Sequence, residues 1–102
     1  MLRIVIGQPG HADGPQAVVA LARALRDSGH EVIHAGGQDD VEPLAEAAVQ
    51  EDADAVALVI DPGGVTLAGR LRDILEGRGA GDIAVVEGDT TVDVLTRIRD
   101  LG

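Results

Sequence analysis

The stretch Ala55-Val56-Ala57-Leu58-Val59-Ile60 is the longest uninterrupted apolar run in the chain, and it decides the fold. The run is apolar at both odd and even positions, so both of its faces need cover. That pattern is typical of a central strand in a parallel sheet. The run is far shorter than the roughly 20 residues that span a bilayer, so it predicts a buried strand and no membrane segment.

Short apolar runs alternate with segments of helical period on both sides of this stretch. Strands are predicted at 2–6, 31–35, 55–60 and 83–86, each followed by an amphipathic helix. Such alternation is typical of a parallel α/β layer fold. Right-handed crossovers predict a doubly wound, flavodoxin-like (Rossmann-like) sheet in the order 2-1-3-4 with helices on both faces. A chain of 102 residues can bury one core, so residues 1–102 are expected to form a single domain.

Capping residues and glycines predict where the helices begin and end. Asp13 can cap the first helix, and Gly29 is placed to end it in a left-handed conformation. The apolar face of this helix is formed by Val18, Leu21, Ala22 and Leu25. The later helices are expected to begin at Asp40, at Thr66 and at Thr90 or Thr91. The inward positions of the last helix are expected to be Val94, Leu95, Ile98 and Leu101.

Charge and missing residue types exclude several classes of function. The formal net charge is −10, from 8 basic and 18 acidic residues. A cationic surface for nucleic-acid phosphates is hard to build from this composition, so neither nucleic acid nor a membrane surface is expected as a partner. Without Cys there is no disulfide or thiolate metal site, and without aromatic residues there is no base stacking. The N-terminus runs directly into a strand-like pattern, so a cytoplasmic protein is expected.

Glycine follows every predicted strand. The positions are Gly7, Gly10 and Gly14 after the first strand, Gly36 and Gly37 after the second, Gly63 and Gly64 after the third, and Gly88 after the fourth. Ligands of doubly wound sheets bind at the carboxyl ends of the strands, and glycine lets a ligand approach the backbone closely. The pattern therefore predicts a rim for a large flat ligand. Tight turns, which favour glycine for its positive φ, are the alternative interpretation.

The first loop, Gly7-Gln8-Pro9-Gly10-His11-Ala12-Asp13-Gly14, narrows the kind of ligand. It lacks the Lys and Ser or Thr of a P-loop, and its glycine spacing is not G-x-G-x-x-G, which argues against a phosphate cradle. It holds one imidazole, His11, with no second His or Cys close by, so a metal site built from protein alone is not expected. A metal held in a macrocycle needs only one axial ligand, which His11 can supply. A solvent-exposed loop histidine is the alternative.

This loop resembles the D-x-H-x-x-G motif of the cobalamin (vitamin B12)-binding domain family, in particular the C-terminal domain of methylmalonyl-CoA mutase and the small subunit of glutamate mutase. The resemblance covers most of the chain. It continues through Ala17-Val18-Val19-Ala20, Asp27-Ser28-Gly29-His30-Glu31-Val32 and Ala53-Asp54-Ala55-Val56.

The resemblance implies a role for each matching residue. His11 would be the lower axial ligand of cobalt in place of the dimethylbenzimidazole base, and Gly14 would admit the displaced nucleotide tail. The other cofactor-binding residues would be Gly10, Gly63, Gly64 and Gly88. The cofactor would be adenosylcobalamin or methylcobalamin. It would be presented to a larger catalytic subunit, a mutase or a methyltransferase, or within a homo-oligomer, and no independent enzyme activity is expected of the chain.

The sequence departs from the family pattern in several places. Pro9 stands where the motif has an Asp that hydrogen-bonds the far imidazole nitrogen, so weaker cobalt–histidine ligation is predicted. Val59-Ile60-Asp61-Pro62 lacks the family's Ser, Asp89 replaces a second Gly, and the family's fifth strand is missing. An exposed edge on the fourth strand would need cover from the last helix or a partner. A second hypothesis therefore stays open, in which the fold has lost the cofactor and acts as a protein-interaction or regulatory module.

Two groups of polar residues near the second and third strands are given structural roles. His30 is predicted to be an exposed turn residue, and His34 a side chain at a strand end. The acidic run from Glu51 to Asp54 is interpreted as a solvated turn. None of these residues is expected to bind a ligand.

Overall fold

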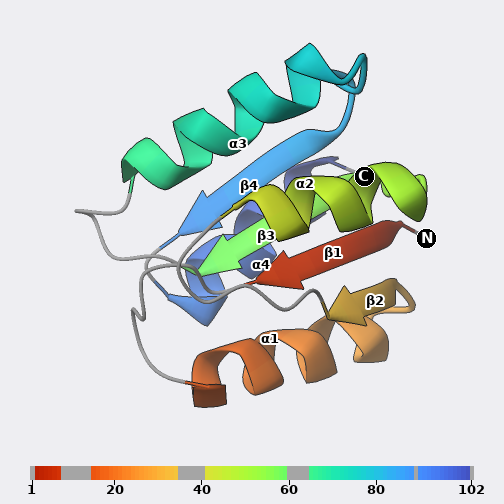
Figure 1. The fold of residues 1–102 in the computed structure, drawn as a ribbon. Coiled ribbons are helices and arrows are strands. Elements are labelled where there is room, and N and C mark those ends of the chain that lie inside the picture. The colour runs from red at the N-terminus through yellow and green to blue at the C-terminus, as the bar shows by residue number, and fades with distance from the viewer. Residues whose placement is uncertain (1, 8–14, 35–40, 60–64, 89, 102) are drawn as a thin grey trace.

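The structure is a computed structural model that describes residues 2–7, 15–34, 41–59, 65–88 and 90–101. Within these residues a parallel sheet lies between two layers of helices (Figure 1). The elements are β1 (Arg3–Gly7), α1 (Pro15–Asp27), β2 (Glu31–His34), α2 (Glu42–Gln50), β3 (Ala55–Val59), α3 (Val65–Gly77), β4 (Ala84–Gly88) and α4 (Thr91–Leu101). The strict alternation of strand and helix confirms the predicted α/β class.

The described strands are arranged in the order β2-β1-β3-β4, as predicted. All three pairs are parallel, and Val56 of β3 pairs with Val5 of β1 on one side and with Val85 of β4 on the other. Every residue of β3 is buried. The uninterrupted apolar run therefore lies where its two-sided hydrophobicity requires, between two strands and between two helical layers.

The two faces of the sheet bury different side chains of the same strands. Val5, Val56 and Leu58 pack against α2 and α3 on one face. The other face packs against α1 and α4 through Ile4, Ile6, Ala55, Ala57 and Val59. In Figure 1, α2 lies in front of the sheet and α4 behind it. Each fully buried Leu, Ile or Val contributes about 1.5–3 kcal/mol of transfer free energy, so these layers hold the helices on the sheet.

Glycine ends the first helix as the sequence predicts. Gly29 has φ of +90°. Its backbone N–H donates to the carbonyl of Arg26 at 2.9 Å, and the N–H of His30 donates to the carbonyl of Leu25 at 3.0 Å. This pair of bonds is the Schellman motif, which satisfies the last carbonyls of a helix.

The same motif ends α2 and α3. After α3 the left-handed residue is Gly79, with φ of +75°, and the N–H of Ala80 donates to the carbonyl of Leu75 at 2.8 Å. After α2 it is Asp52, with φ of +51°, the one non-glycine residue with positive φ in the described part of the chain. The Schellman motif therefore ends all three helices, and after α2 its left-handed residue is an aspartate where the other two have glycine.

Two of the predicted helix starts lie elsewhere in the structure. Thr90 caps α4 as predicted, because its Oγ1 accepts a hydrogen bond from the N–H of Asp93 at 3.1 Å. The cap of α2 is Val41, which makes no side-chain cap bond, whereas Asp40 lies outside the described residues. Thr66 is the second residue of α3 and not its cap. Pro43 lies in the first turn of α2, which fits this start. Proline has no backbone N–H, and in the first turn of a helix that group would have no partner within the helix.

The last helix buries fewer residues than predicted. Val94 and Ile98 are fully buried and Leu95 is half-buried, but Leu101 is 47% exposed, so its predicted inward position is wrong. Leu101 is the last residue of α4 and packs in neither core cluster of the described residues. The periodicity of the helix continues one turn beyond its contact with the sheet.

The free edge of β4 is covered in part by a side chain of α3. The N–H of Ala84 donates to the carbonyl of Asp54 at 3.2 Å, so by the alternation of a parallel strand the backbone of Val85 and Glu87 faces away from β3. The Val85 carbonyl accepts a hydrogen bond from Arg72 Nη2 at 3.1 Å, and the same nitrogen lies 3.6 Å from Glu87 Oε1. Cover for this edge comes from α3 and not from α4, which lies on the face of the sheet beside α1.

Candidate functional site

The carboxyl ends of the strands form one edge of the sheet, where β1 ends at Gly7, β2 at His34, β3 at Val59 and β4 at Gly88. β1 and β3 are neighbours, with Gly7 paired to Leu58. The helices that follow these two strands lie on opposite faces of the sheet. This is the topological switch point of a doubly wound sheet, where ligands bind.

Most of the predicted site residues belong to segments that follow β1 and β3. Gly10, His11 and Gly14 fall between β1 and α1, and Gly63 and Gly64 between β3 and α3. These five residues lie outside the described residues, so their roles stay predictions. Their place in the sequence puts them on the two connections that begin at the switch point.

Gly88 is described, and helix α4 packs closely against it. A Cβ at this position would lie 2.8 Å from Asp93 Cβ and 3.1 Å from the backbone nitrogen of Val94. Neither atom belongs to a flexible side-chain end, so no side chain fits between the end of β4 and the first turn of α4. Packing therefore requires the glycine, and its role at a cofactor stays a prediction.

Gly7 at the end of β1 is crowded from the other face of the sheet. A Cβ there would lie 2.4 Å from Leu44 Cδ2 of α2, and Leu44 is fully buried. The rim of glycines predicted from the sequence is thus explained at both described strand ends by the close approach of a helix. The result is an edge on which β1 and β4 end without side chains.

The other two described strands end in side chains of different kinds. Val59 at the end of β3 is buried and apolar, and His34 at the end of β2 is exposed. In the part of the chain that the structure describes, no three His, Cys, Asp or Glu side chains come together as metal ligands. A histidine ligand for a metal would have to come from His11 or from the exposed His34 at this edge.

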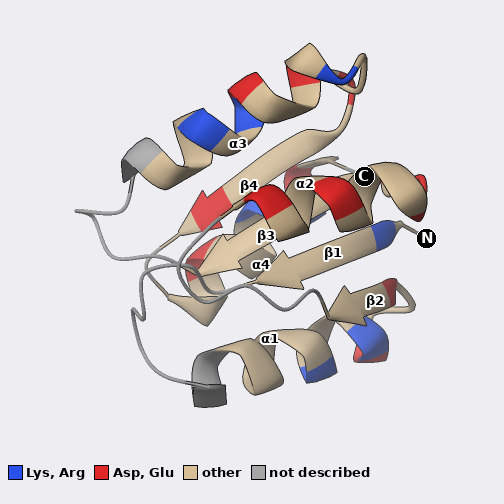
Figure 2. Ribbon diagram, in the orientation of Figure 1, with Lys and Arg blue, Asp and Glu red and all other residues tan. Residues whose placement is uncertain are grey.

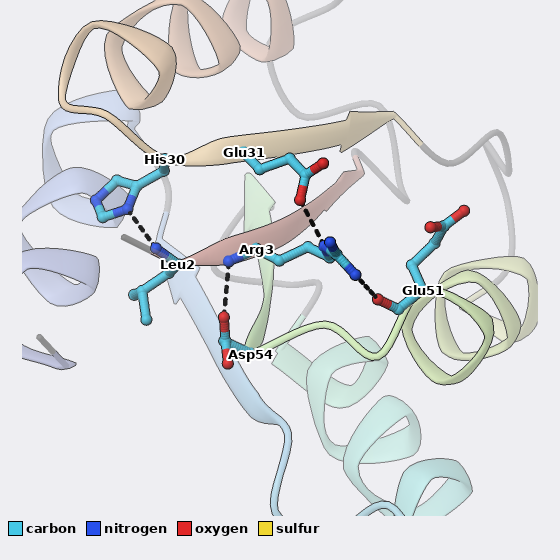
Figure 3. Close-up of polar contacts among 6 residues, drawn as sticks. All are labelled: Leu2, Arg3, His30, Glu31, Glu51 and Asp54. Carbon is cyan, nitrogen blue, oxygen red and sulfur yellow. Dashed lines mark hydrogen bonds and ion pairs between the residues drawn. The ribbon is translucent and has the colours of Figure 1, made fainter.

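The opposite edge of the sheet carries a polar cluster that sequence analysis did not predict (Figure 3). Arg3 donates from Nε to Glu31 and from Nη1 to the Glu51 carbonyl at 2.7 Å, and its backbone N–H donates to Asp54 Oδ2 at 2.7 Å. The hydrogen bond to Glu31 and then its negative charge raise the pKa of Arg3 above its usual value. Asp54 is exposed as expected of a turn residue, but it also holds the start of β1.

His30 belongs to this edge as well. It is half-buried, not a freely exposed turn residue, and its Nδ1 accepts a hydrogen bond from the backbone N–H of Leu2 at 3.0 Å. Because Nδ1 is the acceptor, the neutral ring carries its proton on Nε2. The contacts of Arg3, Asp54 and His30 join residues far apart in sequence, so no local pattern could have indicated them.

Comparison with known proteins assigns the chain to a family. The profile of the B12 binding domain matches residues 2–95. The chain belongs to the B12-binding domain family. The B12-binding domain accounts for nearly all of its length, and the resemblance inferred from the first loop is confirmed.

Three relatives match most of the chain. The 2-hydroxyisobutanoyl-CoA mutase small subunit of Aquincola tertiaricarbonis is 33% identical over 103 residues, covering 99% of this chain and 76% of the relative. A fused isobutyryl-CoA mutase of Geobacillus kaustophilus (strain HTA426) is 35% identical over 91 residues, or 87% of this chain and 8% of the relative. Another from Paraburkholderia xenovorans (strain LB400) is 41% identical over 91 residues, or 87% of this chain and 7% of the relative.

All three of these relatives are mutases or mutase subunits by name. One is a small subunit and two are fused enzymes of which the chain matches a small part, which is consistent with a larger catalytic partner. The chain is accordingly a cobalamin-binding module of the mutase type. None of the helices in the described ranges is both long enough and apolar enough to cross a membrane.

Proposed function

We propose that the chain holds a corrinoid at the carboxyl edge of its sheet, with His11 as the lower axial ligand of cobalt, and presents it to a larger catalytic mutase subunit. The observation that carries the proposal is the position of His11 in a B12-binding domain. It follows the end of β1 and precedes α1, and β1 borders the switch point with β3.

The described fold supports this location for the site. β1 and β3 are neighbours, and the helices that follow them lie on opposite faces of the sheet, so the segment that carries His11 begins at the switch point. Doubly wound sheets bind their ligands at this point. The residues we assign to cofactor binding are Gly10, His11, Gly14, Gly63, Gly64 and Gly88.

The partner we propose is an acyl-CoA mutase subunit. The three relatives are mutases of 2-hydroxyisobutanoyl-CoA and isobutyryl-CoA by name, so a branched acyl-CoA thioester is the proposed substrate class. Adenosylcobalamin supplies radical chemistry, which makes it the proposed form of the cofactor. The chain itself would bind and orient the cofactor: His11 would hold the cobalt, and the partner subunit would supply the substrate site. This work takes place in the cytoplasm.

Titration with cobinamide tests the ligation, because cobinamide lacks the dimethylbenzimidazole base and only a protein nitrogen can then bind cobalt. The measurement is the nitrogen splitting in the cobalt(II) EPR spectrum. We expect splitting in the wild type and its loss in His11→Ala. His34→Ala is the matched control, since His34 is an exposed histidine at the same edge of the sheet, and it should keep the splitting.

Each alternative gives a different result in this experiment. Splitting that survives His11→Ala but is lost in His34→Ala would move the ligand to β2. A corrinoid that binds without nitrogen splitting would contradict the ligation but not the binding. If neither cobinamide nor intact cobalamin binds at micromolar concentration, the chain acts as an interaction or regulatory module that has lost the cofactor.

Pro9 offers a second test of the same ligand. An acidic partner on the far nitrogen of a metal-bound histidine raises its basicity, and loss of such a partner commonly costs 10–100-fold in affinity. We expect Pro9→Asp to tighten cobinamide binding about tenfold, and to have no effect in the His11→Ala background. If Pro9→Asp tightens binding equally in both backgrounds, its effect does not act through His11.

A further inference from the structure

A groove runs along α4 beside the C-terminal end of α1, from Val92 in the first turn after β4 to Leu2 and His30 at the amino edge of the sheet. It has a volume of about 680 Å³ and is lined by nine described residues, among them Leu2, Leu25 and Ile98 at its base. Leu2 precedes β1 and His30 precedes β2, which places one end of the groove at the starts of these strands. The volume lies within the range of natural ligand clefts, about 300–1,000 Å³.

One wall of the groove is a second stripe of helix α4. Val92, Leu95, Thr96 and Arg99 line it at spacing i, i+3, i+4 and i+7, which places them on one side of the helix. The stripe adjoins the core-facing side of α4, which Val94 and Ile98 form, and half-buried Leu95 packs against the same core cluster. Val92 is 70% exposed although it is apolar, and it belongs to neither core cluster of the described residues. This stripe is the pattern by which one helix packs against another.

The groove differs in charge from the rest of the chain. The net charge is −10 and there are 18 acidic residues, yet no Asp or Glu is among the described residues that line the groove. Its charged and ionisable members are Arg99 and His30. Arg99 forms no ion pair with any residue that the structure describes, and His30 offers Nε2–H as a donor because Nδ1 is already bonded to Leu2.

We propose that this groove docks an amphipathic helix of a partner protein, with an acidic side chain of that helix paired to Arg99. The apolar face of the helix packs on Val92 and Leu95, as in other helix-in-groove complexes. A second copy of the chain is a poorer occupant, because two grooves that each carry Arg99 and His30 offer each other no opposite charge.

A displayed library of short helices tests the proposal without any corrinoid, so its result is independent of the His11 experiment. Each helix carries a fixed apolar stripe flanked by positions that vary between Glu and Lys. Selection against the wild-type chain should enrich glutamate next to the stripe. The best peptide, added to ¹⁵N-labelled chain, should shift the amide signals of Val92, Leu95 and Thr96.

Charge reversal then identifies the pairing residue. Arg99→Glu should weaken the selected peptide at least about tenfold, and the peptide with Lys in place of its Glu should recover binding to this variant. Arg97→Glu is the matched control, since Arg97 is an exposed arginine of the same helix that does not line the groove. Both substitutions are on the surface, and far-UV circular dichroism checks that the fold is kept.

Three results would overturn the proposal. Enrichment of lysine, or of neither residue, would contradict the charge assignment. If Arg99→Glu and Arg97→Glu weaken peptide binding equally, the effect comes from the overall charge of the chain and not from a pair with Arg99. Self-association of the chain in sedimentation, lost on Val92→Ser and unaffected by acidic peptide, would make a second copy the occupant.

Discussion

Glycine has different roles at the two edges of the sheet. At the amino edge, Gly29 and Gly79 have φ of +90° and +75°, and a Cβ on either would meet no atom within 4 Å. At the carboxyl edge, Gly7 and Gly88 have no positive φ, and a Cβ on either would collide with a helix. One edge needs glycine for backbone conformation and the other needs it for space, so an alanine scan should separate the two.

The largest effect is expected at Gly88. The atoms a Cβ would meet are Asp93 Cβ and the Val94 backbone, which can move only with the first turn of α4. Overpacking of this kind costs about 1–3 kcal/mol, and we expect Gly88→Ala near the upper end. Urea unfolding followed by far-UV circular dichroism measures it, as the chain has no aromatic fluorophore.

Gly69 of α3 supplies the control for this substitution. A Cβ there would meet nothing within 4 Å, so Gly69→Ala should leave the free energy of unfolding unchanged or raise it by about 0.5–1 kcal/mol through helix propensity. If Gly88→Ala is no more harmful than Gly69→Ala, the assignment of Gly88 to packing is wrong.

Gly7→Ala should have the next largest effect, a loss of about 1–2 kcal/mol. The added methyl meets the end of the Leu44 side chain, which can change rotamer but is fully buried. A double-mutant cycle with Leu44→Val measures this contact, because the smaller side chain makes room for the methyl. The two substitutions should be less harmful together than the sum of their separate effects, and strict additivity would place the cost elsewhere.

Gly29→Ala tests the conformational role at the amino edge. An L-residue in the left-handed region costs about 1 kcal/mol, and no clash adds to it at this position. Gly77, which ends α3 without a positive φ, is the matched position: Gly77→Ala should be neutral. Equal losses at both positions would show that the φ of Gly29 is not what the alanine disturbs. Unfolding midpoints in urea distinguish these outcomes.

The smallest effect is a gain. Asp52 occupies at the end of α2 the left-handed position that Gly29 and Gly79 occupy after α1 and α3. Asp52→Gly removes the steric penalty of the side chain, offset in part by the greater freedom of glycine in the unfolded chain. We expect the free energy of unfolding to rise by about 0.5 kcal/mol. A fall would indicate that the Asp52 charge near Arg3 outweighs the backbone effect.

The fold was predictable because its determinants are local or periodic. Short stretches of sequence indicate the strand β3, the helix α1 and the helix end at Gly29. The strand order follows from the right-handedness of the crossover connections. The helix starts at Asp40 and Thr66 were less well predicted, since a capping residue type indicates a start only where the chain turns there. Leu101 failed because periodicity does not tell how far the sheet extends beneath a helix.

Some features of the candidate site could be predicted from the sequence and others could not. The carboxyl edge was predicted from glycine spacing and the family motif, but the packing role of Gly7 and Gly88 depends on helices that begin elsewhere in the sequence. The contacts of Arg3 with Glu31, Glu51 and Asp54 cross between three segments. The register of the strands brings these residues together. No local sequence pattern indicates that register.

In Figure 2, acidic residues lie along α2, and both arginines and acidic residues lie along α3. One of those arginines, Arg72, bonds the outward-facing carbonyl of Val85 on the last strand. A strand from another molecule that sought to lengthen the sheet there would have to displace a charged donor before making its first bond. The contact therefore works against edge-to-edge aggregation, because it occupies an outward-facing backbone group of the edge strand.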